Sequence, residues 1–235
     1  MIEIKNVSKY YGDKKALDDV SFKVKTGDIF AFIGHNGAGK TTLIKSICGI
    51  IDFEEGEILI DGKSIKKDPI ECKKKMAYVA DDPALYEGMK AINYINFICD
   101  MYEVSAEVRE RNIVKYAKMF DMEKELGNVI KSFSHGMKQK VELIAALSHE
   151  PKVLIMDEPF VGLDPKAIFD MKEVMRDLVK NGGTIFFSTH ILDVAEKLCD
   201  RLAIVKEGKI IKVGRMDKIR GDKSLEKVFL ELEAR

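Results

Sequence analysis

The chain has 235 residues, of which 46% are hydrophobic and 33% are charged, a profile typical of a soluble globular protein with one large domain. Its 39 basic residues balance its 39 acidic residues, which argues against attraction of the whole chain to nucleic acid. The longest apolar runs, such as IFAFI, fall far short of the roughly 20 residues that cross a bilayer, so a membrane role would need another, membrane-spanning chain. Four dispersed cysteines and a start without a secretory signal favour a reducing cytosol.

Strand and helix patterns alternate along most of the chain. The predicted strands, rich in β-branched and aromatic residues, cover residues 2–11, 20–33 with a break at Gly27, 55–65, 75–80, 152–157, 183–188 and 201–214. The predicted helices cover residues 39–49, 135–149, 165–180, 191–198 and 223–235. This alternation predicts an α/β fold with a mostly parallel sheet covered on both faces. The interval 91–129 has only helical periodicity and is interpreted as an inserted helical lobe.

A phosphate-binding loop is predicted by IFAFIGHNGAGKTTLIKSI, where Gly34, Gly39, Lys40 and Thr41 fit G-x-x-x-x-G-K-[ST] between a strand and a helix. Glycines let backbone N–H groups approach phosphate oxygens, and the positive helix end favours an anion. Lys40 can reach the β- and γ-phosphates, and the hydroxyl of Thr41 can ligate magnesium. The dinucleotide fingerprint G-x-G-x-x-G does not fit the glycine spacing here. His35, within the loop, is expected to be an exposed spacer.

Three polar side chains are expected at the ends of two buried strands. KVLIMDEP ends a predicted central strand with Asp157, which can hold magnesium through water, and Glu158, which suits a general base for the attacking water. GTIFFSTH delivers His190 in the same way, where it can hydrogen-bond a γ-phosphate. A P-loop with these partners predicts nucleotide hydrolysis.

Together these motifs resemble the nucleotide-binding subunits of ABC transporters, over residues 2–214. GHNGAGKT resembles the Walker A loop, VLIMDE the Walker B strand, GLDP the D-loop, STH the H-switch and FSHGMKQK the LSGGQ signature. The resemblance implies a P-loop NTPase (RecA-like) core with an N-terminal antiparallel β subdomain and an inserted α-helical subdomain. It implies one ABC ATPase domain over 1–235, divided into a core (1–90 and 136–215), a helical signature subdomain (91–135) and a C-terminal helical extension (216–235).

The resemblance also implies ATP and Mg²⁺ as cofactors and assigns residues to them. Glu158, His190 and Lys40 are the implied catalytic residues. The implied nucleotide-binding residues are Tyr11, which would stack on adenine, Asn36, Gly37, Ala38, Gly39, Lys40, Thr41, Thr42, Ser134 and Gly136. The implied magnesium ligands are Thr41, Asp81 and Asp157.

The resemblance implies that the signature does not complete the nucleotide site of its own chain. Two copies, or a copy and a related ATPase subunit, would pack head to tail, with Ser134 and Gly136 of one completing the γ-phosphate site of the other. The residues agree with this role, because Ser134 is a good N-cap whose helix would aim free N–H groups and a positive dipole at an anion. An integral membrane permease is the implied partner and nucleic acid is not, so the protein would lie on the inner face of the cell membrane.

Three positions depart from the family pattern. His135 stands where the signature has its first glycine and Met137 where it has glutamine, and both variants resemble an export-type subgroup for drugs, antibiotic peptides or lipids. Asp81 stands where the family has the Q-loop glutamine, and its shorter, charged side chain predicts slower or differently coupled hydrolysis.

Two other functions stay open at this point. A soluble ABC-type ATPase acting on nucleic acid or ribosomes would share the motifs, although that class usually carries two cassettes or long coiled coils. A P-loop kinase or switch would leave the signature and His190 unexplained.

Overall fold

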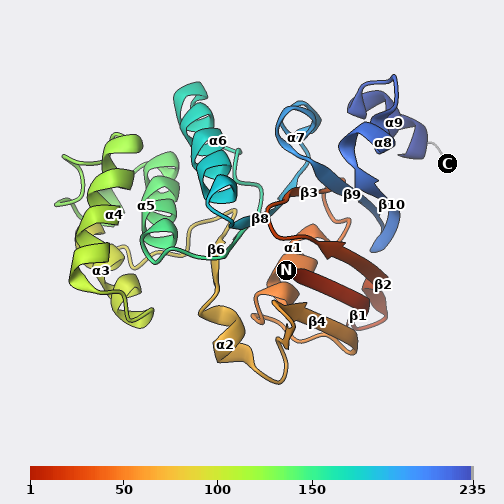
Figure 1. Cartoon of the computed structure of the whole chain (residues 1–235), viewed down its shortest axis with the longest axis horizontal. Coiled ribbons are helices and arrows are strands. Elements are labelled where there is room, and N and C mark those ends of the chain that lie inside the picture. Colours follow the sequence, from red (N-terminus) through yellow and green to blue (C-terminus); the bar gives the residue numbers. More distant parts are fainter. Residues whose placement is uncertain (234–235) are drawn as a thin grey trace.

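A computed structural model describes residues 1–233, which form two β-sheets and a group of helices that lies beyond one edge of the larger sheet (Figure 1). The larger sheet contains, in spatial order, β10 (Lys209–Arg215), β9 (Arg201–Lys206), β3 (Ile29–Ile33), β8 (Thr184–Thr189), β7 (Val153–Met156) and β6 (Met76–Val79). All neighbours pair in parallel except β10 with β9. The predicted, mostly parallel sheet is therefore confirmed.

The central strands are buried on both faces, which is why they read as continuous apolar runs. Every residue of β3, β7 and β8 is buried. On β3, Ile29, Ala31 and Ile33 join the core formed with the helices, whereas Phe30 and Phe32 face a second core. Both faces are covered, as predicted, but the two covers differ in kind.

The second core lies between the parallel sheet and an antiparallel sheet. That smaller sheet has the order β2 (Lys14–Val24), β1 (Ile2–Tyr11), β4 (Glu55–Ile60) and β5 (Lys63–Ser64), and confirms the predicted N-terminal β subdomain. Phe22 of β2 stacks on Phe30 at 5.3 Å between ring centroids, and helix α1 (Lys40–Ile47) completes this layer. One cover of the parallel sheet is therefore a second sheet with a single helix.

The other face carries α5 (His135–Ser148), α6 (Pro165–Lys180) and α7 (Leu192–Leu198), which supply side chains to the first core. Helices α3 (Ala91–Met101) and α4 (Ala106–Met119) pack against α5 and form the inserted helical lobe (Figure 1). A 3₁₀ turn over Ile130–Ser132 leads into α5.

Three further helices complete the described part of the chain. Helix α2 (Pro69–Lys73) lies in a lysine-rich stretch where no helix was predicted, and α8 (Met216–Arg220) precedes the C-terminal helix α9 (Leu225–Glu233). The predicted C-terminal helix is confirmed to Glu233, and its last two positions lie outside the described residues. Within residues 1–233, no helix combines the length and the apolar character that crossing a membrane requires.

Candidate functional site

The loop between β3 and α1 depends on glycines for two physical reasons. Gly37 and Gly39 have φ of 82° and 103°, a region that residues with a side chain rarely adopt. A Cβ on Gly39 would lie 2.5 Å from the carbonyl oxygen of Ala16, and one on Gly34 would lie 2.6 Å from that of Val205. The loop can therefore wrap closely over its neighbours only with glycine at these positions.

The Lys40 ammonium occupies the hollow of this loop. Its Nζ donates to the carbonyl oxygens of Gly34 at 2.8 Å and His35 at 3.1 Å, and lies 3.2 Å from Glu158 Oε1. The residue is only 6% exposed. A buried ammonium held in this way places a fixed positive charge where the loop would receive an anion.

Glu158 connects the phosphate loop to His190. Its Oε2 accepts a hydrogen bond from the backbone N–H of His190 at 3.2 Å and lies 3.0 Å from Nδ1 of the same residue. Its φ of 47° is unusual for a glutamate, and such strained backbone costs about 1–3 kcal/mol. The two predicted strand-end residues are therefore in direct contact, and Glu158 bridges Lys40 and His190.

Asp157 lies beneath this layer, 1% exposed, and is held by a residue that was not predicted. The hydroxyl of Ser188 donates to Asp157 Oδ1 and accepts from the backbone N–H of Glu158 at 3.0 Å. The parallel pairing of β7 with β8 brings the three residues together, because Met156 lies opposite Phe187. The available signal was a hydroxyl residue directly after the apolar run Ile185–Phe187 and two positions before His190.

A cavity of about 310 Å³ opens over this cluster. Its lining includes Tyr11, Asn36, Gly37, Gly39, Lys40, Thr41, Thr42, Asp81 and Glu158, all of which were predicted as site residues, together with Lys14 and Ala16. The predicted residue Ala38 is buried. His190 is not among the described residues that line the cavity, but its side chain contacts Glu158, which does line it. Segments that lie far apart in the sequence therefore converge on one cavity.

The oxygen ligands around this cavity suit magnesium better than a softer metal. Thr41 and Asp81 line the cavity, and Asp157 lies below it. Among the described residues, no three His, Cys, Asp or Glu side chains lie close enough to hold a metal unaided. The donor set therefore fits a hard cation that takes further oxygens from a bound phosphate and from water.

The pKa of Asp81 lies above the ordinary value of an aspartate. Partial desolvation raises its pKa, and the charges of Asp157 and Glu158 raise it further, while His135 acts in the opposite direction. A cation bound in the cavity would relieve the repulsion between Asp81 and the other two carboxylates.

The start of α5 lies outside this cavity. Ser134 caps the helix by accepting from the backbone N–H of Met137 at 3.3 Å, and both Ser134 and His135 are exposed. Neither Ser134 nor Gly136 is among the described residues that line the phosphate cavity. The structure thus separates these two predicted nucleotide-binding residues from the others.

Comparison with known proteins decides the family. A profile described as ABC transporter matches residues 17–161. This chain belongs to the ABC transporter family. It is an ATP-binding subunit with the ATPase domain of that family.

Relatives and solved structures agree over the whole length. The chain is 35% identical to the ABC-type transporter ATP-binding protein EcsA of Bacillus subtilis, covering 99% of this chain and 96% of EcsA. A solved ATP-binding subunit of an ABC transporter is 36% identical, with a TM-score of 0.95 and 99% of each chain covered. A dimeric structure of MJ0796, a bacterial ABC transporter cassette, is 26% identical, with a TM-score of 0.84, covering 92% of this chain and 99% of that one.

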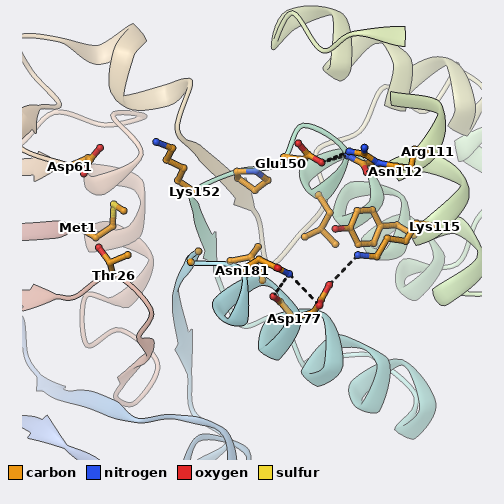
Figure 2. Close-up of a pocket in the computed structure, with 16 residues that line it drawn as sticks. Met1, Thr26, Asp61, Arg111, Asn112, Lys115, Glu150, Lys152, Asp177 and Asn181 are labelled. Carbon is orange, nitrogen blue, oxygen red and sulfur yellow. Dashed lines mark hydrogen bonds and ion pairs between the residues drawn. The ribbon is translucent and has the colours of Figure 1, made fainter. Parts of the chain in front are cut away.

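A second and larger cavity, of about 790 Å³, lies at the opposite end of the parallel strands in this ABC ATPase (Figure 2). It is lined by residues that precede β3, β7 and β8, whereas the phosphate loop and Asp157 follow β3 and β7. Ion pairs join Lys115 to Asp177 at 3.0 Å and Arg111 to Glu150 at 2.7 Å across its helical side. Ligands of open α/β sheets bind at the carboxyl ends of the strands, so the smaller cavity is the candidate site.

Proposed function

We propose that this chain is the ATP-hydrolysing motor of a separate membrane permease and that two copies share each nucleotide. The observation that carries the proposal is the separation described above. The predicted nucleotide residues converge on one cavity, but the capped start of α5 lies outside it. The signature residues do not line the cavity of their own chain. They could contact a nucleotide if a second cassette packed with its cavity facing them.

The predicted site residues of the cavity have separate roles in this proposal. Tyr11, which is 53% exposed at the rim, stacks on the adenine, and the loop from Asn36 to Thr42 binds the phosphates through its N–H groups. Lys40 leaves its loop carbonyls for the β- and γ-phosphates, since a phosphate is the stronger partner for an ammonium. Thr41, Asp81 and Asp157 supply oxygen ligands for Mg²⁺, which neutralises phosphate charge when bound.

Glu158 acts as the general base for the attacking water in this mechanism. Its carboxylate is held between Lys40 and His190, so it is aimed at the phosphate end of the cavity. When a nucleotide draws Lys40 away, one carboxylate oxygen becomes available to accept the proton of water. His190 keeps the other oxygen oriented and donates toward the γ-phosphate.

The second copy supplies the start of α5. Ser134 and the N–H groups near Gly136 approach the γ-phosphate bound by the facing cassette, where the positive end of a 14-residue helix stabilises the anion. ATP then favours the closed pair, and hydrolysis with loss of phosphate lets it reopen. The dimeric arrangement of the related MJ0796 cassette supports this assembly.

A permease would dock on the helical lobe near Asp81. Tyr86, Phe97 and Met101 are exposed there, and Tyr86 lies edge-on to Phe97 at 5.9 Å. Such apolar groups, close to a residue that lines the nucleotide cavity, suit a membrane protein's cytoplasmic segment. We therefore place the chain at the inner face of the membrane, and the signature variants His135 and Met137 favour export. Recovery of an integral membrane protein by the tagged chain supports this assignment, whereas recovery of RNA or ribosomes would contradict it.

Mixing two inactive variants tests the shared site. Lys40→Ala removes a phosphate ligand and Ser134→Ala removes a helix cap, so neither pure variant should hydrolyse ATP at more than a small fraction of the normal rate. In a mixed head-to-tail pair, both defects fall in one site and the other site is intact. ATPase activity should therefore reappear on mixing. Mixtures that stay as inactive as their components would overturn the head-to-tail proposal, provided that tagged copies are shown to exchange.

A further inference from the structure

The phosphate loop is in contact with the C-terminal helix. His35 Nε2 lies 3.5 Å from a carboxylate oxygen of Glu233, and the imidazole ring meets the ring of Phe229 edge-on, with centroids 4.9 Å apart. His35 lies between Gly34 and Asn36, and its carbonyl oxygen accepts from both Lys40 Nζ and the N–H of Ala38. One residue therefore connects the loop that would hold phosphate with α9, nearly 200 positions later.

The helix on the far side of this contact is itself anchored. Phe229 is 5% exposed, and α9 packs against α7 and α8. Lys206 of β9 donates to the carbonyl oxygen of Glu233 at 2.8 Å, and Glu196 of α7 accepts from the N–H of Leu225 at 2.8 Å. Helix α9, which supplies both contacts of His35, is therefore packed against the rest of the described fold.

The outer side of the loop faces a cavity, whereas Lys40 holds the carbonyl oxygens of Gly34 and His35 from within the loop. A cavity of about 230 Å³ separates residues 35–38 from Val205, Lys206, Glu207 and Glu233. The carbonyl oxygen of Ala38 accepts from the N–H of Gly208, which holds the second half of the loop. The first half contains His35, whose side chain is 63% exposed yet reaches across to α9.

We propose that His35 is a positioning residue through which α9 holds the phosphate loop ready for a nucleoside triphosphate. The sequence predicts that His35 is an exposed spacer. The side chain is exposed, but its contacts with Phe229 and Glu233 indicate a further role. A glycine-rich loop has much conformational freedom to lose when it binds phosphate, and a contact that restricts the free loop reduces this loss. The inference rests on the proposed nucleotide site and adds to it a function for residues 225–233.

The proposal predicts an effect on nucleotide binding rather than on the chemical step. Loss of the contact frees part of the loop, so His35→Ala should raise the Kd for ATP roughly fivefold, which corresponds to about 1 kcal/mol. Because Glu158, Asp157 and Ser188 remain in place, kcat should change less than about twofold. His35 is exposed, so its replacement should leave the unfolding transition unchanged.

The experiment compares His35→Ala, Glu233→Ala and the double variant with Leu230→Ala as a matched control on the same helix. Leu230 is 60% exposed. The Kd is measured with a fluorescent ATP analogue, and kcat and KM by phosphate release. The single variants at positions 35 and 233 should weaken binding, the double variant should bind no worse than His35→Ala, and the control should bind normally.

Additive effects in the double variant, or an unchanged Kd in His35→Ala, would overturn the role of α9. A fall in kcat at constant KM would overturn it as well, because positioning for binding would not be the cause. Lys40→Ala separates this failure from failure of the nucleotide site. If that variant also binds normally, the proposed nucleotide site itself is wrong.

Discussion

Two polar regions of this ABC ATPase are built in opposite ways. At the carboxyl ends of β3, β7 and β8, Lys40, Asp157 and Glu158 are buried and bonded to one another or to Ser188 and His190. At the start of α5, Ser134 is exposed and makes one capping bond within the chain. The first region has its partners within the fold, and the second presents a positive helix end to the solvent.

The difference shows how a single chain can contain both a complete charge network and half of a binding surface. A buried charge is tolerated only when it is paired and hydrogen-bonded, which explains why the first region is so closely connected. A capped helix end carries only partial charges and can stay exposed without cost until an anion arrives. Substitutions in the buried region and at the start of α5 should therefore impair the protein in different ways.

The largest expected effect comes from Glu158→Gln in the buried network. An amide of the same shape cannot take a proton from water, so ATP turnover should fall about 10² to 10⁴-fold. The glycine loop and Lys40 remain, so ATP should still bind and a paired species should accumulate. Phosphate release and gel filtration with ATP measure the two results. A variant that stays monomeric with ATP and hydrolyses it at the normal rate would contradict the role of Glu158 as general base. It would also contradict the proposed difference between the two regions.

Ser188→Ala should produce the second largest effect, because it leaves two buried groups without a partner. The N–H of Glu158 loses its acceptor and Asp157 loses a donor. Each orphaned group costs about 1–3 kcal/mol, so the free energy of unfolding should fall by about 2 kcal/mol or more and turnover should fall with it.

Ser148→Ala is the matched control for that variant. Ser148 is also fully buried, but its hydroxyl donates to the carbonyl oxygen of Ile144 in its own helix, so its loss orphans no buried group. Urea unfolding and ATPase assays of both variants make the comparison. Equal losses at the two serines would show that Ser188 acts only as a packed side chain.

Much of the buried region could be predicted from the sequence because its signals are local. Gly34 to Thr41 and the pair Asp157 and Glu158 are short motifs next to runs with clear strand or helix periodicity. The role of Ser188 could not be predicted in this way, since it depends on the register of β7 against β8. The order of the strands is likewise set by pairings between distant segments.

The contacts of α9 and α5 with the site escaped prediction for the same reason. His35 and Glu233 are adjacent only because β9 and α9 fold back against the phosphate loop. Glu142 of α5 accepts from the N–H of Ala80, next to Asp81, only because α5 packs against the end of β6. No local sequence pattern distinguishes Glu233 or Glu142, and both resemble ordinary charged residues on a helix.

Glu142 connects the two compared regions and predicts a smaller, pH-dependent effect. Burial raises the pKa of Glu142 to about 7, so the folded state binds its proton more tightly than the unfolded state does. Stability from this group is present below the unfolded pKa of about 4.5 and is lost as the pH rises through about 7. The Glu142→Gln variant cannot ionise, so its stability relative to the wild type should rise between these pH values and reach a gain of about 3 kcal/mol near pH 7.

Urea unfolding of both proteins from pH 4.5 to pH 8 measures this gain. Burial lowers the pKa of nearby His149 to about 4, so His149 adds stability as the pH rises from about 4 to 6.5 and partly masks Glu142 in the wild type. The difference between variant and wild type removes that contribution, since both contain His149. A difference that is constant with pH would refute the assignment to Glu142.

The smallest expected effect comes from substitution of Asp81. This residue lines the cavity and follows Ala80, whose N–H donates to Glu142 of α5. A glutamine would reach further toward the attacking water. It would also remove a charge that is disfavoured by partial burial and by repulsion from Asp157 and Glu158, the causes that raise the pKa of Asp81. Asp81→Gln should therefore raise ATP turnover by roughly two- to fivefold and change the magnesium concentration at half-maximal rate. Asp82→Asn is the matched control, because Asp82 is exposed and does not line the cavity. If Asp81→Gln matches the wild type in both rate and magnesium dependence, the aspartate has no part in hydrolysis. The buried network of Lys40, Asp157 and Glu158 would then support ATP hydrolysis without a contribution from the loop that leads from β6 to the helical lobe.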